Sequence, residues 1–208
     1  KWQYSPTSEI GKLTKSSPMG AIDHPFNPAA LALGADATFV ARIMDRDPKH
    51  MREILLASHR HKGSSFIEIY QNCNVFNDGA FATFTDKKTK AEETLFLIEG
   101  EPLIFGADKN KAMKLDGMNP IIVEIDPDSI PEDLWIHDPT DRTKAHLLSR
   151  MFDDVSNRGH FPRPFGIFYR EDRYRYEEAM KEQIENSIQI KGKGELSDLL
   201  SGKNTWTI

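Results

Sequence analysis

The stretch QNCNVFND, residues 71–78, contains the single cysteine of the chain and is the segment best suited to chemistry. Cys73 lies among three asparagines and Asp78, and such polar neighbours suit a thiolate that acts as a nucleophile or as a metal ligand. The alternative is a small buried hydrophobic residue, because cysteine is among the most buried residue types. One cysteine cannot hold a metal cluster alone, so a ligand role requires further cysteines from other sequence or another chain.

A nucleophilic Cys73 would need a histidine close by, and the stretch HRHKG, residues 59–63, is the candidate. We expect this stretch at the end of a helix, on the side of the sheet away from the carboxyl edge where Cys73 lies. The predicted geometry therefore disfavours a cysteine and histidine pair. None of the histidines has HExxH or other metal-site spacing, which favours ordinary surface or core histidines.

The opening stretch KWQYSPTSEIGKLTKSSPMG, residues 1–20, is unusually rich in hydroxyl side chains, proline and glycine. Its turn amides and hydroxyls, together with Lys12 or Lys15, could hold an anion such as a phosphate or a carboxylate. The same composition is also typical of an exposed linker. Considered alone, the stretch leaves both interpretations open.

The composition excludes several classes of protein. Hydrophobic residues make up 38% and charged residues 28% of the 208 residues, and no apolar run approaches the length of about 18 residues that a membrane helix needs. The net charge of -5 and the scattered basic residues argue against a nucleic-acid surface. With one cysteine and no visible leader, we expect a cytoplasmic protein without an internal disulfide.

The first part of the chain is predicted to alternate helix and strand. The expected elements are a helix from Asn27-Pro28 to Gly34, a strand at 37–42, a helix from Asp47-Pro48 to Gly63 and a strand at 65–70. Strand, helix and strand in this order form a βαβ unit with parallel strands, so the predicted class is α/β. Ligands of such sheets lie beyond the carboxyl ends of the strands, which is where residues 71–78 begin.

The second part is predicted to be an irregular α+β extension. We expect antiparallel strands at 94–99 and 101–106 around Gly100, strands at 121–125, 134–137 and 165–170, a helix opened by Asp138-Pro139, and a charged helix at 173–189. The tail that follows ends in a short amphipathic piece suited to docking on a partner.

Three ordered motifs together resemble a known family. KWQYSPTSEIGKLTKSSPMG, DHPFNPAALALGADATFVAR and HKGSSFIEIYQNCNVFND resemble, in order and spacing, the thiamine-diphosphate-binding β subunit of the 2-oxoacid:ferredoxin oxidoreductases, and especially those acting on 2-oxoglutarate. The resemblance is strong over residues 1–80 and looser beyond. It implies the thiamine-diphosphate-binding fold with a mostly parallel sheet, and an N-terminal part that is missing here. Residues 1–90 would then be the C-terminal half of the cofactor domain, and residues 91–208 an extension that packs on it and on the partner subunit.

The resemblance assigns roles to particular residues. Lys1 matches a basic position near the substrate and would face the distal carboxylate of 2-oxoglutarate as a catalytic-site residue. Gln3, Ser5 and Thr7 would line the cofactor pocket. Cys73, in QNCNVFN, would supply the fourth thiolate of a [4Fe-4S] cluster whose other three thiolates lie upstream, as do the magnesium ligands.

The implied activity is the oxidative decarboxylation of a 2-oxoacid with coenzyme A, giving an acyl-CoA, CO₂ and reduced ferredoxin, possible in reverse as carboxylation. The implied cofactors are thiamine diphosphate, Mg²⁺ and the [4Fe-4S] cluster. The implied partners are an α subunit, in an (αβ)₂ assembly, and ferredoxin. Three alternatives stay open: a sister enzyme for pyruvate or branched 2-oxoacids, a Cys73-dependent hydrolase, and a noncatalytic interaction domain.

Overall fold

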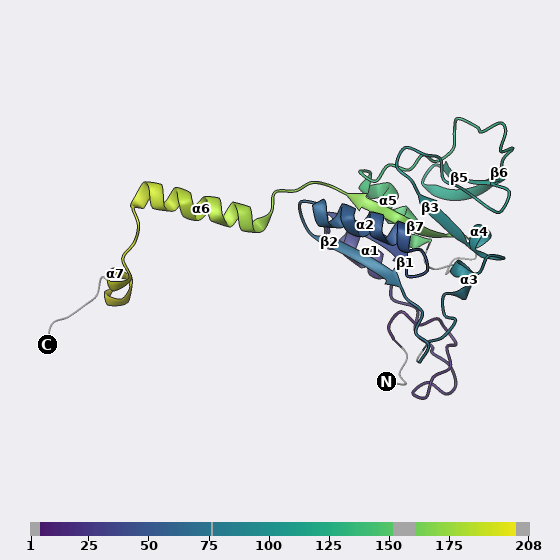
Figure 1. Ribbon diagram of the computed structural model, residues 1–208, viewed down its shortest axis with the longest axis horizontal. Helices are drawn as coiled ribbons and strands as arrows, with labels where there is room; N and C mark the ends of the chain where they lie inside the picture. Colours follow the sequence, from purple (N-terminus) through teal and green to yellow (C-terminus); the bar gives the residue numbers. More distant parts are fainter. Residues whose placement is uncertain (1–4, 76, 152–160, 203–208) are drawn as a thin grey trace. The chain divides into compact units, whose positions relative to one another are not determined.

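The computed structural model describes residues 5–75, 77–151 and 161–202, and its elements fall into two units (Figure 1). The first unit is Lys1–Asp172 and contains both β-sheets. The second unit is Arg173–Ile208 and contains the helices α6, Tyr176–Lys191, and α7, Leu196–Ser201. Within the described residues, no helix is both long enough and apolar enough to cross a membrane.

The central sheet of the first unit has the strand order β2-β1-β7-β3. Its strands are β1 (Phe39–Met44), β2 (Ser65–Tyr70), β3 (Thr94–Leu97) and β7 (Arg163–Arg170). The pairs β1 with β2 and β3 with β7 are parallel, whereas β1 and β7 are antiparallel. The sheet is therefore mixed but mostly parallel, which confirms the predicted α/β class.

The predicted βαβ unit is present as β1, α2 (Pro48–Arg60) and β2. The carboxylate of Asp47 caps α2 by accepting a hydrogen bond of 3.2 Å from the amide of His50. An aspartate that directly precedes a proline in the first helical turn favours this capping. The helix ends at Arg60, three residues before the predicted stop at Gly63.

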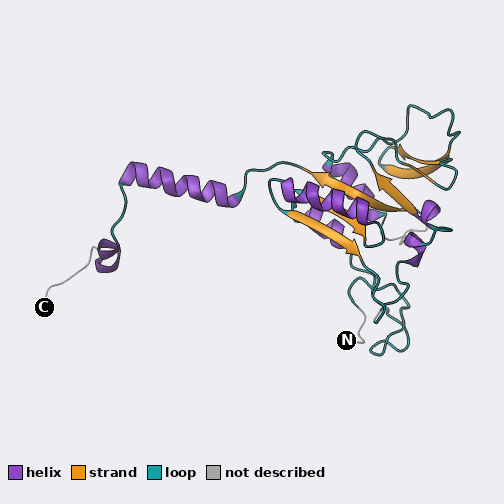
Figure 2. Cartoon of the chain, viewed as in Figure 1, coloured by secondary structure: helices purple, strands orange, loops and turns teal. Residues whose placement is uncertain are grey.

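Helices cover both faces of the central sheet (Figure 2). Successive strand residues point to opposite faces, so β1 serves two cores. On one face, Val40 packs with side chains of α1 (Pro28–Gly34) and α5 (Arg142–Arg150). On the other face, Phe39, Ala41 and Ile43 pack with Ile54 of α2. Burial on both faces explains why every residue of β1 is buried.

The helix predicted to open at Asp138-Pro139 begins later than expected. The side chain of Asp138 instead accepts hydrogen bonds from the amide and hydroxyl of Thr140, in a turn before the helix. The N-cap of α5 is Asp141, whose carboxylate accepts a hydrogen bond of 3.0 Å from the amide of Lys144. Either aspartate could cap a helix, but Asp138 is used in the turn and Asp141, three residues later, caps α5.

The antiparallel pairing predicted around Gly100 is wrong. Strand β3 pairs with β7, and the next strand, β4 (Ile104–Phe105), pairs with β5 (Lys111–Asp116), which in turn pairs with β6 (Asn119–Glu124). After the turn, the amides of Gly100 and Leu103 donate to the carbonyls of His137 and Trp135, both at 2.9 Å. The backbone after Gly100 therefore forms hydrogen bonds with the segment at 134–137, and not with β3 as an antiparallel pair around Gly100 would require.

Strand β5 was missed by the sequence analysis, and the strand predicted at 134–137 forms only an isolated bridge between Pro102 and Ile136. That segment nevertheless places Leu134 and Trp135 in the core. Two short helices, α3 (Ala82–Thr85) and α4 (Lys90–Glu93), connect the end of β2 to β3. Strands β3 and β7 lie after residue 90 and pair with each other in the central sheet, which also contains β1 and β2 from before residue 90. The central sheet therefore spans the domain division expected at residue 90. The different functions assigned to the two parts stay a prediction.

Buried histidines make stability depend on pH. His137 is 2% exposed, its Nε2 donates to the carbonyl of Ile167 at 2.9 Å, and its Nδ1 has no hydrogen-bond partner in the described part of the chain. Burial lowers the pKa of His137 more than that hydrogen bond raises it. The unfolded chain then binds more protons, so we expect the free energy of unfolding to fall as the pH drops below about 6.5.

Denaturant unfolding at a series of pH values measures this effect. We expect His137→Gln to give a shallower fall between neutral and mildly acidic pH, because the titrating group is removed. His24→Gln, at an exposed position, is the control and should keep the slope of the unaltered protein. An unchanged slope in His137→Gln would assign the pH dependence to other groups, such as His50 and His61, whose pKa values are also lowered by burial.

Candidate active site at the carboxyl edge of the sheet

The loop that carries Cys73 leaves the carboxyl end of β2 and is fastened to the end of β1. The amide of Asp45, directly after β1, donates to the carbonyl of Tyr70 at 3.0 Å. The carboxylate of Asp45 accepts a hydrogen bond of 3.0 Å from the amide of Asn72. The first bond continues the pairing of β1 and β2 beyond the strands, and the second, to a side chain, fixes the point where the loop begins.

The side chain of Asn72 organises the loop from within. Its amide nitrogen donates to the side-chain oxygens of Asn74 and Asp78, both at 2.8 Å. Its amide oxygen accepts from the backbone of Gly79 at 2.9 Å. The polar residues around Cys73 thus shape the loop by bonding to one another, a role that the sequence pattern alone did not distinguish from direct chemistry.

Cys73 itself is half-buried in this loop. Its carbonyl accepts a hydrogen bond of 2.9 Å from the amide of Asn77, which closes a tight turn. The side-chain oxygen of Asn77 is buried and has no hydrogen-bond partner within the part of the chain described here. A buried polar atom of this kind in the turn that carries the cysteine suits a site completed by a further group.

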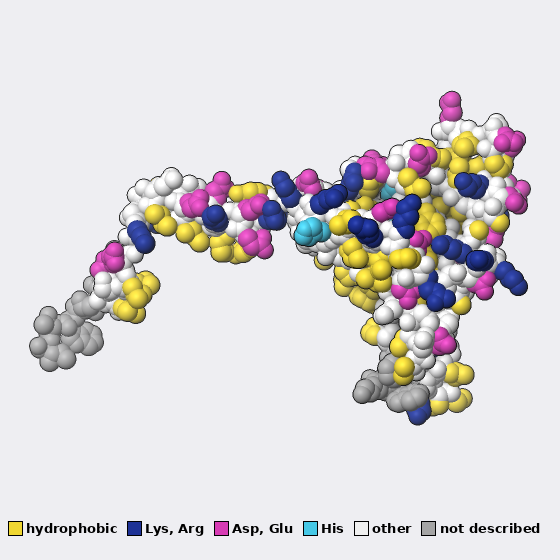
Figure 3. Space-filling view, in the orientation of Figure 1, with side chains coloured by type: hydrophobic (Ala, Val, Ile, Leu, Met, Phe, Trp, Pro, Cys, Tyr) yellow, Lys and Arg dark blue, Asp and Glu magenta, His cyan; other side chains and the backbone are white. Residues whose placement is uncertain are grey.

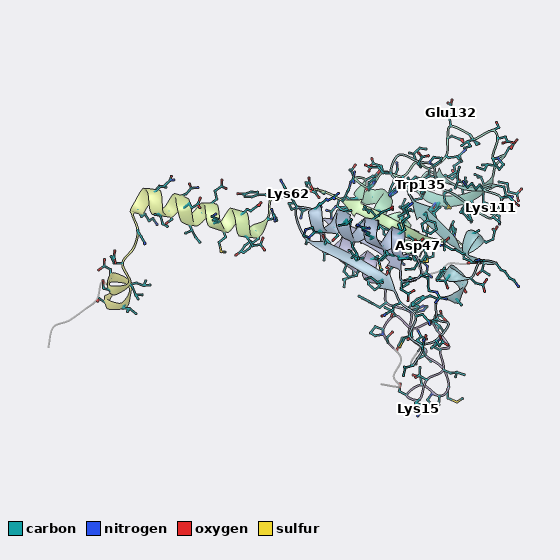
Figure 4. The ribbon with its side chains drawn as sticks, in the orientation of Figure 1. Lys15, Asp47, Lys62, Lys111, Glu132 and Trp135 are labelled. Atoms are coloured by element: carbon teal, nitrogen blue, oxygen red, sulfur yellow. The ribbon has the colours of Figure 1, made fainter. Side chains whose placement is uncertain are left out.

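The opening loop, residues 5–26, lies near the carboxyl ends of these strands (Figure 1). The hydroxyls of Ser5 and Thr7 are 2.9 Å apart, and the amide of Phe26 donates to the carbonyl of Pro6 at 2.6 Å, which closes the loop on itself. Lys15 lies at the far tip of the loop (Figure 4), so an anion site there would be distant from the sheet. Lys1 and Gln3 lie outside the described residues.

Thr7 lines a cavity of about 740 Å³ between the opening loop and the end of β2. Most of its wall is apolar or aromatic, with Ile10, Phe66, Tyr70, Phe81 and Phe84 among the lining residues. Ser5 is not among the residues that line it, although it bonds to Thr7. The structure thus brings one of the predicted pocket residues to a cavity of the size of a small-molecule site.

Polar groups of this cavity that the sequence analysis missed come from distant strands. The guanidinium of Arg163 donates to the hydroxyl of Tyr70 at 2.7 Å and lies over the ring of Phe84 at 5.2 Å. Burial raises the pKa of Tyr70 above its usual value, so the phenol stays protonated at neutral pH. Arg163 is 93 residues from Tyr70, and no local pattern connects the two.

Glu68 also lines the cavity and forms an ion pair with Arg42 from the neighbouring strand. The two residues are register partners in the parallel pair β1 and β2, and Arg42 Nε lies 2.7 Å from Glu68 Oε2. The side chain of Arg42 is 0% exposed and that of Glu68 is 13% exposed. A charge inside each of the apolar runs FVARIM and SFIEIY was the sequence signal for this pair.

The histidines near the end of α2 lie at the opposite end of the sheet from Cys73. A ring nitrogen of His61 is 2.8 Å from the hydroxyl of Thr38, directly before β1, whereas Cys73 follows the end of β2. Figure 4 shows the two ends of α2 far apart, with Asp47 before its first residue and Lys62 after its last. The geometry agrees with the expectation that these histidines do not pair with Cys73. Among the described residues, no group of three or more potential metal ligands occurs.

Similarity to known proteins extends over the whole chain. It is 40% identical, over 213 aligned positions, to the 2-oxoglutarate oxidoreductase subunit KorB of Mycobacterium tuberculosis, covering 100% of this chain and 55% of that protein. A 2-oxoacid:ferredoxin oxidoreductase subunit beta of Saccharolobus solfataricus is 41% identical over 88 residues, covering 42% of this chain and 29% of that subunit. No model of a protein family matches the chain.

A solved structure shares the fold. It is the 2-oxoglutarate:ferredoxin oxidoreductase from Magnetococcus marinus, with 2-oxoglutarate, coenzyme A and succinyl-CoA bound. The TM-score is 0.59 at 20% identity, and the match covers 95% of this chain and 50% of that one. The chain thus spans about half the length of these proteins.

These similarities relate the chain to oxidoreductase subunits with an α/β sheet. More specifically, its sequence is similar to those of β subunits of 2-oxoacid:ferredoxin oxidoreductases, and the resemblance noted in the sequence is confirmed.

Proposed function

We propose that the chain is part of the β subunit of a 2-oxoacid:ferredoxin oxidoreductase that acts on 2-oxoglutarate. The observation that carries the proposal is the 40% identity, over all of this chain, to a subunit named for 2-oxoglutarate. The reaction would be the coenzyme A-dependent oxidative decarboxylation of 2-oxoglutarate to succinyl-CoA and CO₂, with electrons passed to ferredoxin, and carboxylation in the reverse direction.

The residues around Cys73 fit one corner of a [4Fe-4S] cluster. A half-buried thiol in a loop fastened by Asn72, in a turn where the side-chain oxygen of Asn77 has no partner among the described residues, offers a soft anionic ligand in a polar surrounding. The three further thiolates would come from sequence not present in these 208 residues, since the chain has one cysteine. When bound, the cluster would accept electrons one at a time.

The cavity at Thr7 supports a thiamine diphosphate site on the same edge of the sheet. Hydroxyls of Ser5 and Thr7 are close enough to act together, and we propose Gln3 as a third residue that lines the cofactor pocket. When bound, thiamine diphosphate would supply the carbanion and the electron sink for decarboxylation, and Mg²⁺ would hold its diphosphate through ligands outside this chain. Tyr70, kept neutral by burial, would donate or accept hydrogen bonds there without carrying charge.

The proposed partners are an α subunit, in an (αβ)₂ assembly, and ferredoxin. The names of the relatives as subunits support the first, since a subunit implies further chains. We place the assembly in the cytoplasm, where reduced ferredoxin and coenzyme A would be available, and propose neither a nucleic-acid nor a membrane role.

Ferredoxin reduction by the protein purified with its α subunit tests the proposal. With coenzyme A present, we expect 2-oxoglutarate to be oxidised in preference to pyruvate and to branched 2-oxoacids. A preference for pyruvate would reassign the substrate, whereas a colourless protein that does not reduce ferredoxin and is inactivated by thiol alkylation would favour a hydrolase.

Lys1 is the proposed selectivity residue for the distal carboxylate. We expect Lys1→Ala to raise the KM for 2-oxoglutarate by about 10-fold or more, since a lost charge-assisted hydrogen bond costs about 1.5–3 kcal/mol. The KM for pyruvate, which has no distal carboxylate, should change little. Steady-state kinetics with both substrates measure the difference, and Lys12→Ala in the opening loop serves as the control. Equal changes for both substrates would remove the role of Lys1.

A further inference from the structure

Helix α6 carries a row of large apolar side chains at positions four residues apart. The row consists of Tyr176, Met180, Ile184 and Ile188, whose exposures are 72%, 41%, 54% and 45%. With 3.6 residues per turn, residues four apart follow one another along one side of a helix. Figure 3 shows this apolar side of α6.

None of the residues of α6 is buried in the described structure. An isolated helix of 16 residues is marginal in water, because most helical stability in proteins comes from packing an apolar face. A row of four large side chains therefore indicates a helix whose apolar side is covered in the functional assembly.

The charged residues of α6 indicate which charges a partner surface that covers the apolar row would carry. The helix contains four glutamates and two lysines, a net charge of -2. On a regular helix, Glu177, Lys181 and Glu185 lie along one side of the row, whereas Ala179 and Ser187 lie along the other side. The complementary surface is thus an apolar groove with basic residues along one of its sides and uncharged residues along the other.

A second copy of α6 fits this description poorly. A self-paired coiled coil needs apolar residues that repeat every 3.5 residues, and a row with strict four-residue spacing turns away from a partner helix within a few turns. Two copies would also bring together two helices of net charge -2 each. The row suits a steeply crossing partner, since rows of residues four apart pack at an angle of about -50°.

We propose that the row of α6 docks into an apolar groove of the α subunit that is lined on one side by lysine or arginine. This inference rests on the proposed function, which supplies the α subunit as partner. It assigns to the second unit the task of holding the two subunits together, separately from the site at the carboxyl edge of the sheet.

The affinity of the full chain for its α subunit tests the inference. We expect Ile184→Glu to weaken the complex by about 10-fold or more, because a buried anchor of an interface is replaced by a charge. Asn186→Glu introduces the same side chain on the opposite side of the helix and should leave the affinity unchanged. Ile184→Leu should also preserve it. Circular dichroism of each variant reports whether α6 remains helical.

Four outcomes of the affinity measurements would contradict the proposed docking of α6 on the α subunit. Equal affinity of Ile184→Glu and the unaltered chain would overturn it while leaving the proposed function intact. Equal weakening by Ile184→Glu and Asn186→Glu would also overturn it, since no specific face would be involved. A dimer of the chain alone that Ile184→Glu dissociates would assign the row to a second copy instead. Failure of the unaltered chain to bind the α subunit would reject the inference together with the subunit assignment.

Discussion

Replacing Cys73 by serine is expected to abolish ferredoxin reduction by the assembled enzyme. A hydroxyl is a far weaker ligand for iron than a thiolate, so the cluster would lose one corner. The rate should fall by more than about 100-fold, since even changes to groups that only support metal ligands cost about 10–100-fold. Stopped-flow reduction of ferredoxin and the iron content of the purified complex measure the two effects.

Val75→Ser is the matched control for this experiment, because Val75 is 70% exposed in the same loop. It introduces the same side chain two residues away and should leave the iron content and the rate near those of the unaltered complex. Thiamine diphosphate binding should persist in both variants, because Thr7 and its cavity are untouched. Unchanged iron content and unchanged electron transfer in Cys73→Ser would refute the ligand assignment.

Replacing Glu68 by alanine is expected to destabilise the first unit by about 3–5 kcal/mol, the cost of leaving one charge of a buried pair without its partner. The side chain of Arg42 is 0% exposed and would lose the carboxylate that lies 2.7 Å from its Nε. The carbonyl of Pro164, at 3.3 Å, and the ring of Phe168 are neutral and cannot replace a negative charge. Urea unfolding measures the change.

Two variants separate the ion pair from ordinary surface effects. Glu132→Ala, at an exposed position, should change the free energy of unfolding by less than about 0.5 kcal/mol. The double variant Arg42→Met with Glu68→Leu removes both charges and should recover most of the loss, since apolar replacement of a buried pair is often neutral or stabilising. A double variant as unstable as Glu68→Ala would show that packing, and not the uncompensated charge, sets the cost.

Local signals in the sequence determined the elements that present the site. Asp47 before Pro48 predicted where α2 begins, and the apolar strands on either side predicted the parallel pair β1 and β2. Parallel strands place their carboxyl ends at one edge, so the position of the Cys73 loop followed from the same pattern. These predictions succeeded because capping and strand periodicity act over a few residues.

Tertiary structure alone decided which distant segments complete the core and the cavity. Strand β7 pairs with β1 on one side and β3 on the other, although it lies more than a hundred residues after β1. The same strand brings Arg163 to Tyr70 across 93 positions. The wrong pairing expected around Gly100 has the same cause. Strand partners are chosen by burial and hydrogen bonding summed over the whole unit, and no short window of residues contains that sum.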